Sequence, residues 1–212
     1  MKTAWTALLT LTLLLPIAIP TQAMGPAKIG VKAGISIADE KFEFDNPEIT
    51  LDPDTRTGLV IGLFMEKPLL EAFSVRGGAT YVQKGSELSV PRIGEGNEIL
   101  GTEKFQDRRT YISIEGLGKL NIPVGKTTTY ALFGPRLDIK VKSESEFGVL
   151  DESDIKSTVF GLTFGLGQQF TVKSLGSIFV EANYYYDVGS SLDIEGLKIT
   201  NKALAVMAGV SF

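Results

Sequence analysis

The chain has 212 residues, a formal net charge of −4, no His and no Cys. These features exclude His metal ligands, catalytic triads that use His as the base, and structural disulfides. The negative balance also argues against nucleic acid as a partner, because nucleic-acid-binding proteins neutralise phosphates with Lys and Arg.

The first 23 residues, "MKTAWTALLTLTLLLPIAIPTQA", combine one Lys, a long apolar run and a small residue at the end. This pattern predicts a secretory signal peptide that is cleaved after Ala23. The alternative is a membrane anchor, which Pro16 and Pro20 disfavour because they interrupt the apolar run. Residues 24–212 then form one domain. They lack a further run of about 18 apolar residues, so any membrane contact must be made by strands.

Eight segments alternate in polarity with the period of a β-strand. They are residues 28–38, 56–66, 72–84, 109–120, 128–142, 156–170, 177–187 and 202–212. Short connections alternate with long ones at 39–55, 85–108, 143–155 and 188–201. Short periplasmic turns and long outer loops are typical of outer-membrane barrels. The predicted fold is therefore an all-β, eight-stranded, antiparallel, up-and-down transmembrane β-barrel.

The two faces of these segments differ sharply. One face is uncharged and bulky, as in Leu59, Ile61, Leu63 and Met65. The opposite face is rich in Gly and carries five charges of each sign: Lys32, Glu66, Arg76, Glu115, Lys119, Arg136, Asp138, Lys140, Glu181 and Asp187. Buried charges must be paired. We therefore expect the bulky face to meet lipid and these ten residues to form a structural charge network in a plugged lumen.

The last segment ends at Phe212, and an unpaired terminal strand would expose its backbone. We expect it to pair with residues 28–38 and close the barrel, which places Phe212 at the periplasmic interface. Aromatic residues gather at both interfaces of such barrels. Pro135 lies inside the fifth segment, where the missing N–H predicts a bulge or a bend.

Several stretches in order resemble the PorT-like outer-membrane β-barrel family. They are "IGVKAGISIAD", "FSVRGGATYVQKGSEL", "YISIEGLGKLNIPVG", "YALFGPRLDIKV", "FGLTFGLGQQF" and "FVEANYYYDVGSS". The resemblance implies an eight-stranded barrel in the outer membrane of Gram-negative bacteria. It also implies that Phe212 acts as a C-terminal signal for the outer-membrane assembly machinery. Gly116 and Gly118 depart from the family pattern in the fourth strand. The secretion role of the family's namesake is not carried over.

The sequence offers little sign of catalysis. Glu115 and Glu181 are the two mid-strand acids that could exchange protons, but ion pairing with Lys119, Arg76 or Arg136 is the simpler reading. The acidic stretches 39–56 and 144–154 could hold Ca²⁺ or Mg²⁺, although they lack the EF-hand spacing and also suit solvated loops. The "GKT" at 125–127 lacks the rest of a phosphate loop. We expect no cofactor and no metal.

These observations predict a non-enzymatic barrel that serves surface interaction or envelope support through its acidic outer loops. Its expected partners are outer-membrane lipid and lipopolysaccharide, the assembly machinery and an unidentified extracellular partner of the loops, and it acts as a monomer. Two alternatives stay open at this point. One is a soluble periplasmic barrel that binds a small apolar ligand inside, as lipocalins do; the other is a narrow pore or secretion accessory.

Overall fold

The computed structural model describes residues 25–44, 53–93, 99–145, 156–172, 176–194 and 197–212. The expected signal peptide, residues 1–23, lies outside the described residues. No helix among the described residues is long and apolar enough to cross a bilayer.

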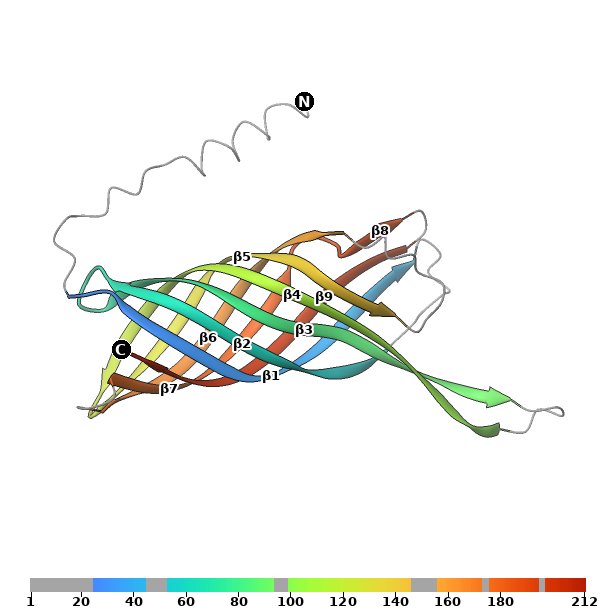
Figure 1. Cartoon of the computed structure of the whole chain (residues 1–212), viewed down its shortest axis with the longest axis horizontal. Coiled ribbons are helices and arrows are strands. Elements are labelled where there is room, and N and C mark those ends of the chain that lie inside the picture. The colour runs from blue at the N-terminus through green and yellow to red at the C-terminus, as the bar shows by residue number, and fades with distance from the viewer. Residues whose placement is uncertain (1–24, 45–52, 94–98, 146–155, 173–175, 195–196) are drawn as a thin grey trace, which may run out of the picture.

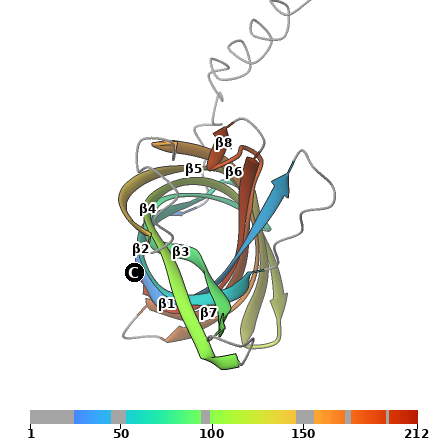
Figure 2. The ribbon, with the colours of Figure 1, turned by 90° about the vertical axis from the view of Figure 1, so that its right-hand side faces the viewer.

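Within these described ranges, nine strands make a single antiparallel sheet. They are β1 (Lys28–Phe44), β2 (Asp54–Pro68), β3 (Phe73–Ile93), β4 (Ile99–Val124), β5 (Thr127–Ser145), β6 (Thr158–Val172), β7 (Gly176–Asp187), β8 (Leu192–Ile194) and β9 (Leu197–Ser211). Each strand from β1 to β7 pairs with the next in the chain, and β9 pairs with both β7 and β1. The result is a closed barrel of eight strands, visible as a ring in Figure 2, with β8 attached to the end of β9.

Pairing of the last strand, β9, with the first, β1, closes the barrel, so neither strand has an exposed edge. The β1–β9 ladder runs from Gly30 opposite Ser211 to Phe44 opposite Leu197. Beyond it, the backbones of Ile29 and Phe212 exchange two hydrogen bonds, of 3.1 Å and 2.8 Å. In lipid every backbone N–H and C=O must find a partner within the protein, and a closed barrel provides one for each.

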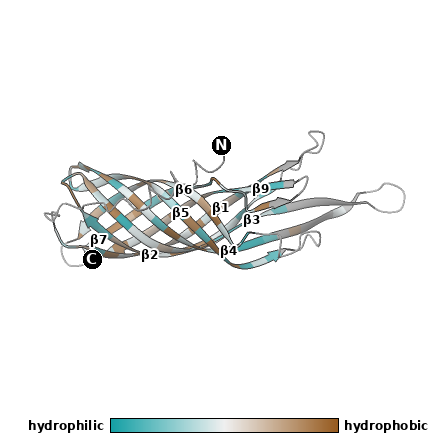
Figure 3. Ribbon diagram, turned by 90° about the horizontal axis from the view of Figure 1, so that it is seen from above, coloured by the Kyte–Doolittle hydropathy of each residue, from teal (hydrophilic) through white to brown (hydrophobic). Residues whose placement is uncertain are grey.

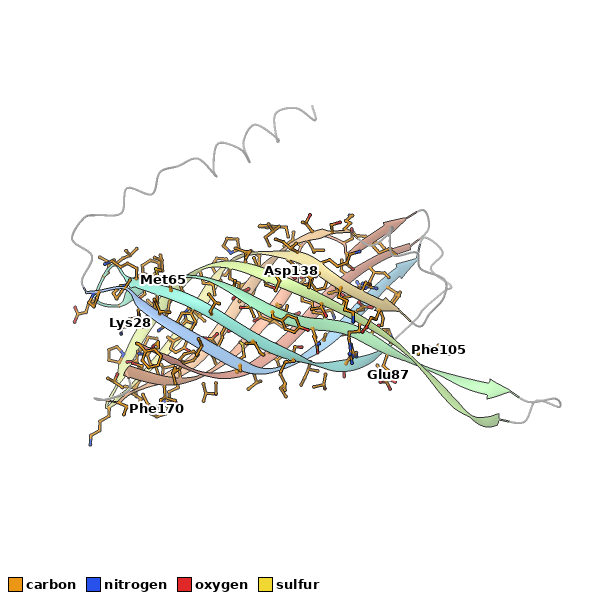
Figure 4. All side chains as sticks on the ribbon, viewed as in Figure 1. Lys28, Met65, Glu87, Phe105, Asp138 and Phe170 are labelled. Carbon is orange, nitrogen blue, oxygen red and sulfur yellow. The ribbon has the colours of Figure 1, made fainter. Side chains whose placement is uncertain are left out.

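The barrel has two different ends (Figure 1). At one end, which we call the short-turn end, β2–β3 and β4–β5 are joined by tight turns, and Lys28, Met65 and Phe170 lie there (Figure 4). At the other, the ribbon end, β3 and β4 continue as a two-stranded ribbon past the rest of the wall. The β2–β3 ladder stops at Glu87 and the β4–β5 ladder at Asp107, whereas β3–β4 pairing continues to Ile93 opposite Ile99.

The long connections are shorter than the sequence suggested, because the strands extend into them. Residues 39–44 belong to β1 and 54–55 to β2, most of 85–108 forms the β3–β4 ribbon, and 188–201 contains β8 and the start of β9. Their acid content made them look like loops. These segments nevertheless keep aromatic and β-branched residues, which favour pairing even where the strand leaves the membrane. The remaining parts, 45–52, 94–98, 146–155 and 195–196, lie outside the described residues.

Pro135 does not cause the bulge that its position suggested. The β4–β5 register is the same on both sides of it, with Glu115 opposite Arg136 and Gly118 opposite Phe133. Only the contacts in between are missing from the ladder. Pro135 keeps its place opposite Leu162 on the other side, in β6. The missing N–H therefore costs a local gap in one ladder and no change of register.

The bulky face points outward along the whole wall. Leu63 and Leu166 are 61% and 66% exposed, and the other large apolar residues of the predicted lipid face are exposed or half-buried as well. Hydrophobic and hydrophilic residues alternate along each strand of the barrel (Figure 3). An apolar belt of this extent could not stay in water. The lipocalin-like alternative, with the apolar face inside, is therefore wrong.

Candidate functional site

The lumen is the site on which the sequence placed the charge network. Nine of the ten predicted residues have side chains at the inner face and are at most 6% exposed. The tenth, Lys140, is half-buried and lies beside a shift in the β4–β5 register. Five further charged residues are buried with them: Glu40, Arg56, Lys84, Asp107 and Arg109. The buried charged residues among those described then number seven of each sign, so their charges cancel when all of them are ionised.

Six of these residues form the turn-side cluster: Lys32, Glu66, Arg76, Glu115, Lys119 and Glu181. They make one continuous chain of alternating charge. Lys119 Nζ lies 3.0 Å from Glu66, which also binds Arg76 at 3.0 Å. Arg76 Nη1 reaches Glu181 at 2.6 Å, and Lys32 Nζ then joins Glu181 and Glu115 at 3.4 Å and 3.3 Å. Because every carboxylate touches a cation, the cost of removing these charges from water is offset within the cluster.

Aromatic rings enclose the turn-side cluster. The Arg76 guanidinium carbon lies 4.2 Å from the centroid of the Phe64 ring, and Lys119 Nζ lies 4.2 Å from that of Tyr130. The Tyr130 hydroxyl donates a 2.9 Å hydrogen bond to Glu181. Room for this ring exists because residue 167 is Gly: a Cβ there would lie 2.3 Å from the Tyr130 ring. The Gly-rich inner face thus makes space for large side chains.

The central cluster is a closed ring of four charges: Lys84, Arg136, Asp138 and Asp187. Lys84 Nζ binds Asp138 at 2.6 Å and Asp187 at 3.1 Å. Arg136 contacts both carboxylates from the other side, reaching Asp187 at 2.5 Å. Ser113 donates a further 2.6 Å hydrogen bond to Asp138. Each ion therefore has two partners of opposite charge.

Uncharged side chains fill the lumen around these clusters. Val60, Val82, Tyr111, Tyr185 and Met207 belong to one packed cluster, in which each is at most 1% exposed. The largest fully buried side chains of the described residues include Arg109, Arg136, Tyr111, Tyr130 and Tyr185, all inside the barrel. An eight-stranded barrel is just wide enough for its side chains to fill it. The described side chains thus pack the lumen closely.

The ribbon-side cluster lies beyond the apolar belt. Arg109 binds Glu40 at 3.0 Å and also contacts Asp107, while Arg56 is buried nearby. At this height the wall carries polar residues outside, such as Asp39 and Lys202, which are 3.3 Å apart. The cluster is therefore outside the membrane-spanning part of the strands. Burial raises the pKa of Glu40 to about 7; Arg109 opposes the shift and Asp107 adds to it.

The two acids that could have formed a catalytic pair are engaged by cations. Glu115 accepts from Lys32, Thr80 and Thr163, and Glu181 accepts from Lys32, Arg76, Tyr130 and Asn183. Within the described residues, no three His, Cys, Asp or Glu side chains converge as metal ligands would. Much of the acidic stretches 39–56 and 144–154 lies outside the described residues, so the choice made there, solvated loops without a bound cation, stays a prediction.

The buried residues that the sequence reading missed had a detectable signal. Lys84 is the last residue of the third predicted segment and has the inward parity of Arg76. Glu40 continues the inward parity of Lys32 and Ser36. Arg56 and Arg109 are the first residues of their predicted segments and also have inward parity, while Asp107 lies in the connection 85–108. Applying the period-two count to the ends of the segments places Arg56, Lys84 and Arg109 inside, and extending it into the connections adds Glu40 and Asp107.

Solved structures of outer-membrane barrels share this architecture. The outer membrane protein OprG from Pseudomonas aeruginosa aligns over 90% of this chain and 98% of its own, with 13% identity and a TM-score of 0.51. Neisserial surface protein A aligns over 89% and 100%, with 14% identity and a TM-score of 0.48. The attachment invasion locus protein Ail of Yersinia pestis aligns over 89% and 100%, with 15% identity and a TM-score of 0.44. At 13% identity the likeness to OprG concerns the fold alone.

Sequence comparison gives the family. None of the curated proteins searched matches the chain. The family described as outer membrane protein beta-barrel domain matches residues 21–193, which covers most of the sequence. The chain therefore belongs to the outer membrane protein beta-barrel domain family, and it is an eight-stranded barrel of the outer membrane.

Proposed function

We propose that this protein is a non-enzymatic, non-conducting outer-membrane barrel that serves surface interaction or envelope support through its ribbon end. The observation that carries the proposal is the packed lumen, in which seven cations and seven anions are buried together. A pore needs an open water-filled path. A catalytic carboxyl needs access to a substrate, whereas Glu115 and Glu181 are held by Lys32 deep inside.

The ribbon end supports a role at the cell surface. Short turns face the periplasm in barrels of this kind, so the opposite end faces outward. There the β3–β4 ribbon continues for six residue pairs past Glu87, which amounts to roughly 20 Å at the usual rise of a strand. Both of its edges lack neighbouring strands within the described residues. An extended partner segment could pair with such an edge.

The other expected partners follow from the wall. The apolar belt requires lipid. Phe212, 66% exposed at the end of the closing ladder, is placed where the assembly machinery could read it. The order of the motifs suggests a PorT-like subgroup. The narrow-pore alternative finds no support in the packed interior, and a monomer suffices because the barrel closes on itself.

Conductance measurements test the proposal. The purified, refolded protein is inserted into a planar lipid bilayer, with folding checked by heat-modifiable gel mobility and insertion competence by a porin in the same bilayer. We expect no steady single-channel conductance above the leak of the bare membrane. Reproducible, steady steps from the folded protein would contradict a plugged lumen.

A further inference from the structure

The barrel wall has a break between β7 and β9 near the ribbon end. The β7–β9 ladder stops at Tyr186 opposite Lys202. Past that point the backbone N–H groups of Val188 and Gly189 both donate to Phe160 in β6, so the chain turns away from β9. Pairing on this side of β9 resumes only at Ile199, opposite Leu192 of β8. Two β9 residues, Thr200 and Asn201, therefore have no ladder partner on this side.

A pocket of about 490 Å³ lies in this break. Its lining is Lys41, Tyr184, Tyr186, Asp187, Val188, Lys198, Thr200, Asn201 and Lys202. The one acid among them, Asp187, pairs with Lys84 and Arg136, although its Oδ2 has no hydrogen-bond partner among the described residues. The lining thus contains three lysines and two tyrosines, at the height where the outward face changes from apolar to polar.

The strand register brings the three lysines together. Lys198, Thr200 and Lys202 alternate along the outward face of β9, and Lys41 of β1 stands directly opposite Thr200. Diagonal neighbours across an antiparallel pair are roughly 7–8 Å apart, so Lys41 is near both other lysines. Asp39 stands opposite Lys202 and Glu43 opposite Lys198. The side chains of Asp39 and Lys202 are each 39% exposed, so water screens their attraction and the ion pair is weak.

A buried donor lies deeper in the same pocket. Asn201 is 1% exposed, and neither atom of its side-chain amide has a hydrogen-bond partner among the described residues. A buried amide without partners is costly, and such a group commonly awaits a ligand or an ordered water. Asn201 has the inward parity of β9 and so borders the pocket from the lumen side, whereas Thr200, on the outward face, can donate its hydroxyl to an anionic oxygen.

An apolar groove continues from this pocket along the outer wall. It has a volume of about 600 Å³ and is lined by Ala131, Leu132, Phe133, Phe164, Gly165, Leu166, Ala182, Tyr184 and Leu204. Tyr184 lines both the groove and the lysine pocket. The small Ala131 and Ala182 flank Leu166 in the ladder, so the wall is recessed between larger neighbours. The groove belongs to the apolar belt, which lipid covers in the outer membrane.

We propose that this wall is a binding site for one lipid with an anionic phosphate headgroup in the outer leaflet. Lys41, Lys198 and Lys202 hold the phosphate, Thr200 donates a hydrogen bond to it, and one acyl chain lies in the groove past Tyr184. Juxtamembrane lysines attract anionic lipids in this way. The site rests on the outward orientation of the ribbon end that the proposed function assumes.

Native mass spectrometry of the folded barrel in detergent tests the site, with diphosphoryl lipid A as probe and phosphatidylcholine as reference lipid. We expect lipid A to remain bound in preference to phosphatidylcholine. The triple variant Lys41→Gln/Lys198→Gln/Lys202→Gln should bind lipid A more weakly, by a factor of about ten or more. The matched control Lys142→Gln, which removes an exposed lysine of β5 on another part of the wall, should bind as the unchanged protein does.

A second pair of variants tests the groove. Ala182→Phe fills it and should weaken lipid A binding, whereas Ala33→Phe, an outward position on β1 away from the groove, should not. Equal lipid A binding by the triple variant would overturn the proposal. The proposal would also be overturned if inorganic phosphate alone bound as tightly as lipid A and lost that binding in the triple variant, while Ala182→Phe left lipid A binding unchanged. Heat-modifiable gel mobility checks that each variant is folded. If the unchanged protein is a folded, non-conducting barrel that shows no preference for lipid A, this site is refuted and the proposed function still stands.

Discussion

Single residues in the lumen carry large and unequal energies. Glu181 is 1% exposed and is shared by Arg76, Lys32 and Tyr130. Glu144 also has two cationic neighbours, Lys142 at 2.5 Å and Arg108 at 3.8 Å, but these side chains are about half exposed. The two acids therefore have similar ionic contacts but differ in exposure. Solvent screens the second set and leaves the first almost unscreened.

Glu181→Gln should therefore lower the free energy of unfolding by about 3–5 kcal/mol, because it leaves buried cations without their anion. Glu144→Gln is the matched control and should leave the stability unchanged. Urea titration of the refolded protein in lipid vesicles, followed by gel mobility, measures both. Equal stability of the two variants would show that the interior charges are not buried as described.

Glu40 should make the ribbon end sensitive to pH. Its pKa is raised from the ordinary value of 4.5 to about 7 by burial, so its contribution to stability is complete below the unfolded value and is lost as the pH rises through 7. Asp107, whose pKa burial also raises, competes for the same Arg109. The folded state should accordingly be less stable at about pH 8 than at about pH 5.

Hydrogen exchange at the β1 and β4 amides around Glu40 and Arg109 gives the readout, since it reports local opening. Exchange should speed up between the two pH values by more than the intrinsic chemical rate. In Glu40→Gln this excess should shrink, whereas Glu144→Gln should behave as the unchanged protein. A pH dependence that persists in full in Glu40→Gln would assign the effect to another group.

At the scale of the strands, the β3–β4 ribbon is separate from the barrel it extends. The last wall contacts on either side are Asp54 with Glu87 and Asp107 with Ser145, and the ribbon beyond pairs only with itself in the described residues. Figure 4 places Glu87 near the point of departure and Phe105 farther along. The barrel therefore needs none of the ribbon's contacts to close.

Replacing residues 88–105 by a tight Asn-Gly turn, which keeps Glu87 opposite Gln106, should leave heat-modifiable mobility intact and the unfolding midpoint nearly unchanged, because type I′ turns match the twist of paired strands. Trypsin added to intact cells should cut the unmodified protein at Arg92 or Lys104 and spare the shortened one. Failure of the shortened chain to fold, or protection of these sites until the outer membrane is permeabilised, would contradict an independent, outward ribbon.

For the whole molecule, the sequence predicts the barrel well and its interior in part. Period-two alternation places Ile61 outside and Gly62 inside, and an alternating strand of constant register preserves that parity over its length. Which charges meet could not be predicted, since Lys32 and Glu181 are 149 positions apart and are joined only by closure. The extent of the strands was underestimated because polar content marks the membrane boundary and not the end of pairing.

Two local features lay beyond pattern reading. Whether Pro135 shifts the register depends on how β4 and β6 accommodate it, and both keep their alignment. The sequence ends the seventh segment at residue 187, where β7 ends, but it does not reveal that Val188 and Gly189 then donate to the backbone of Phe160 and leave a break beside β9. The fold thus follows from alternation, whereas the lysine pocket follows from tertiary hydrogen bonding.

The plugged interior with an outward apolar face is tested most directly by two single-cysteine variants, because the natural chain has no Cys. Leu162 faces outward in β6, while Thr163 is 0% exposed and donates to Glu115. In lipid vesicles, the Leu162→Cys variant should react with a lipid-phase reagent, and the Thr163→Cys variant should resist both that reagent and a water-soluble one until the barrel is unfolded. Rapid aqueous labelling at position 163, or protection from lipid at position 162, would contradict the account.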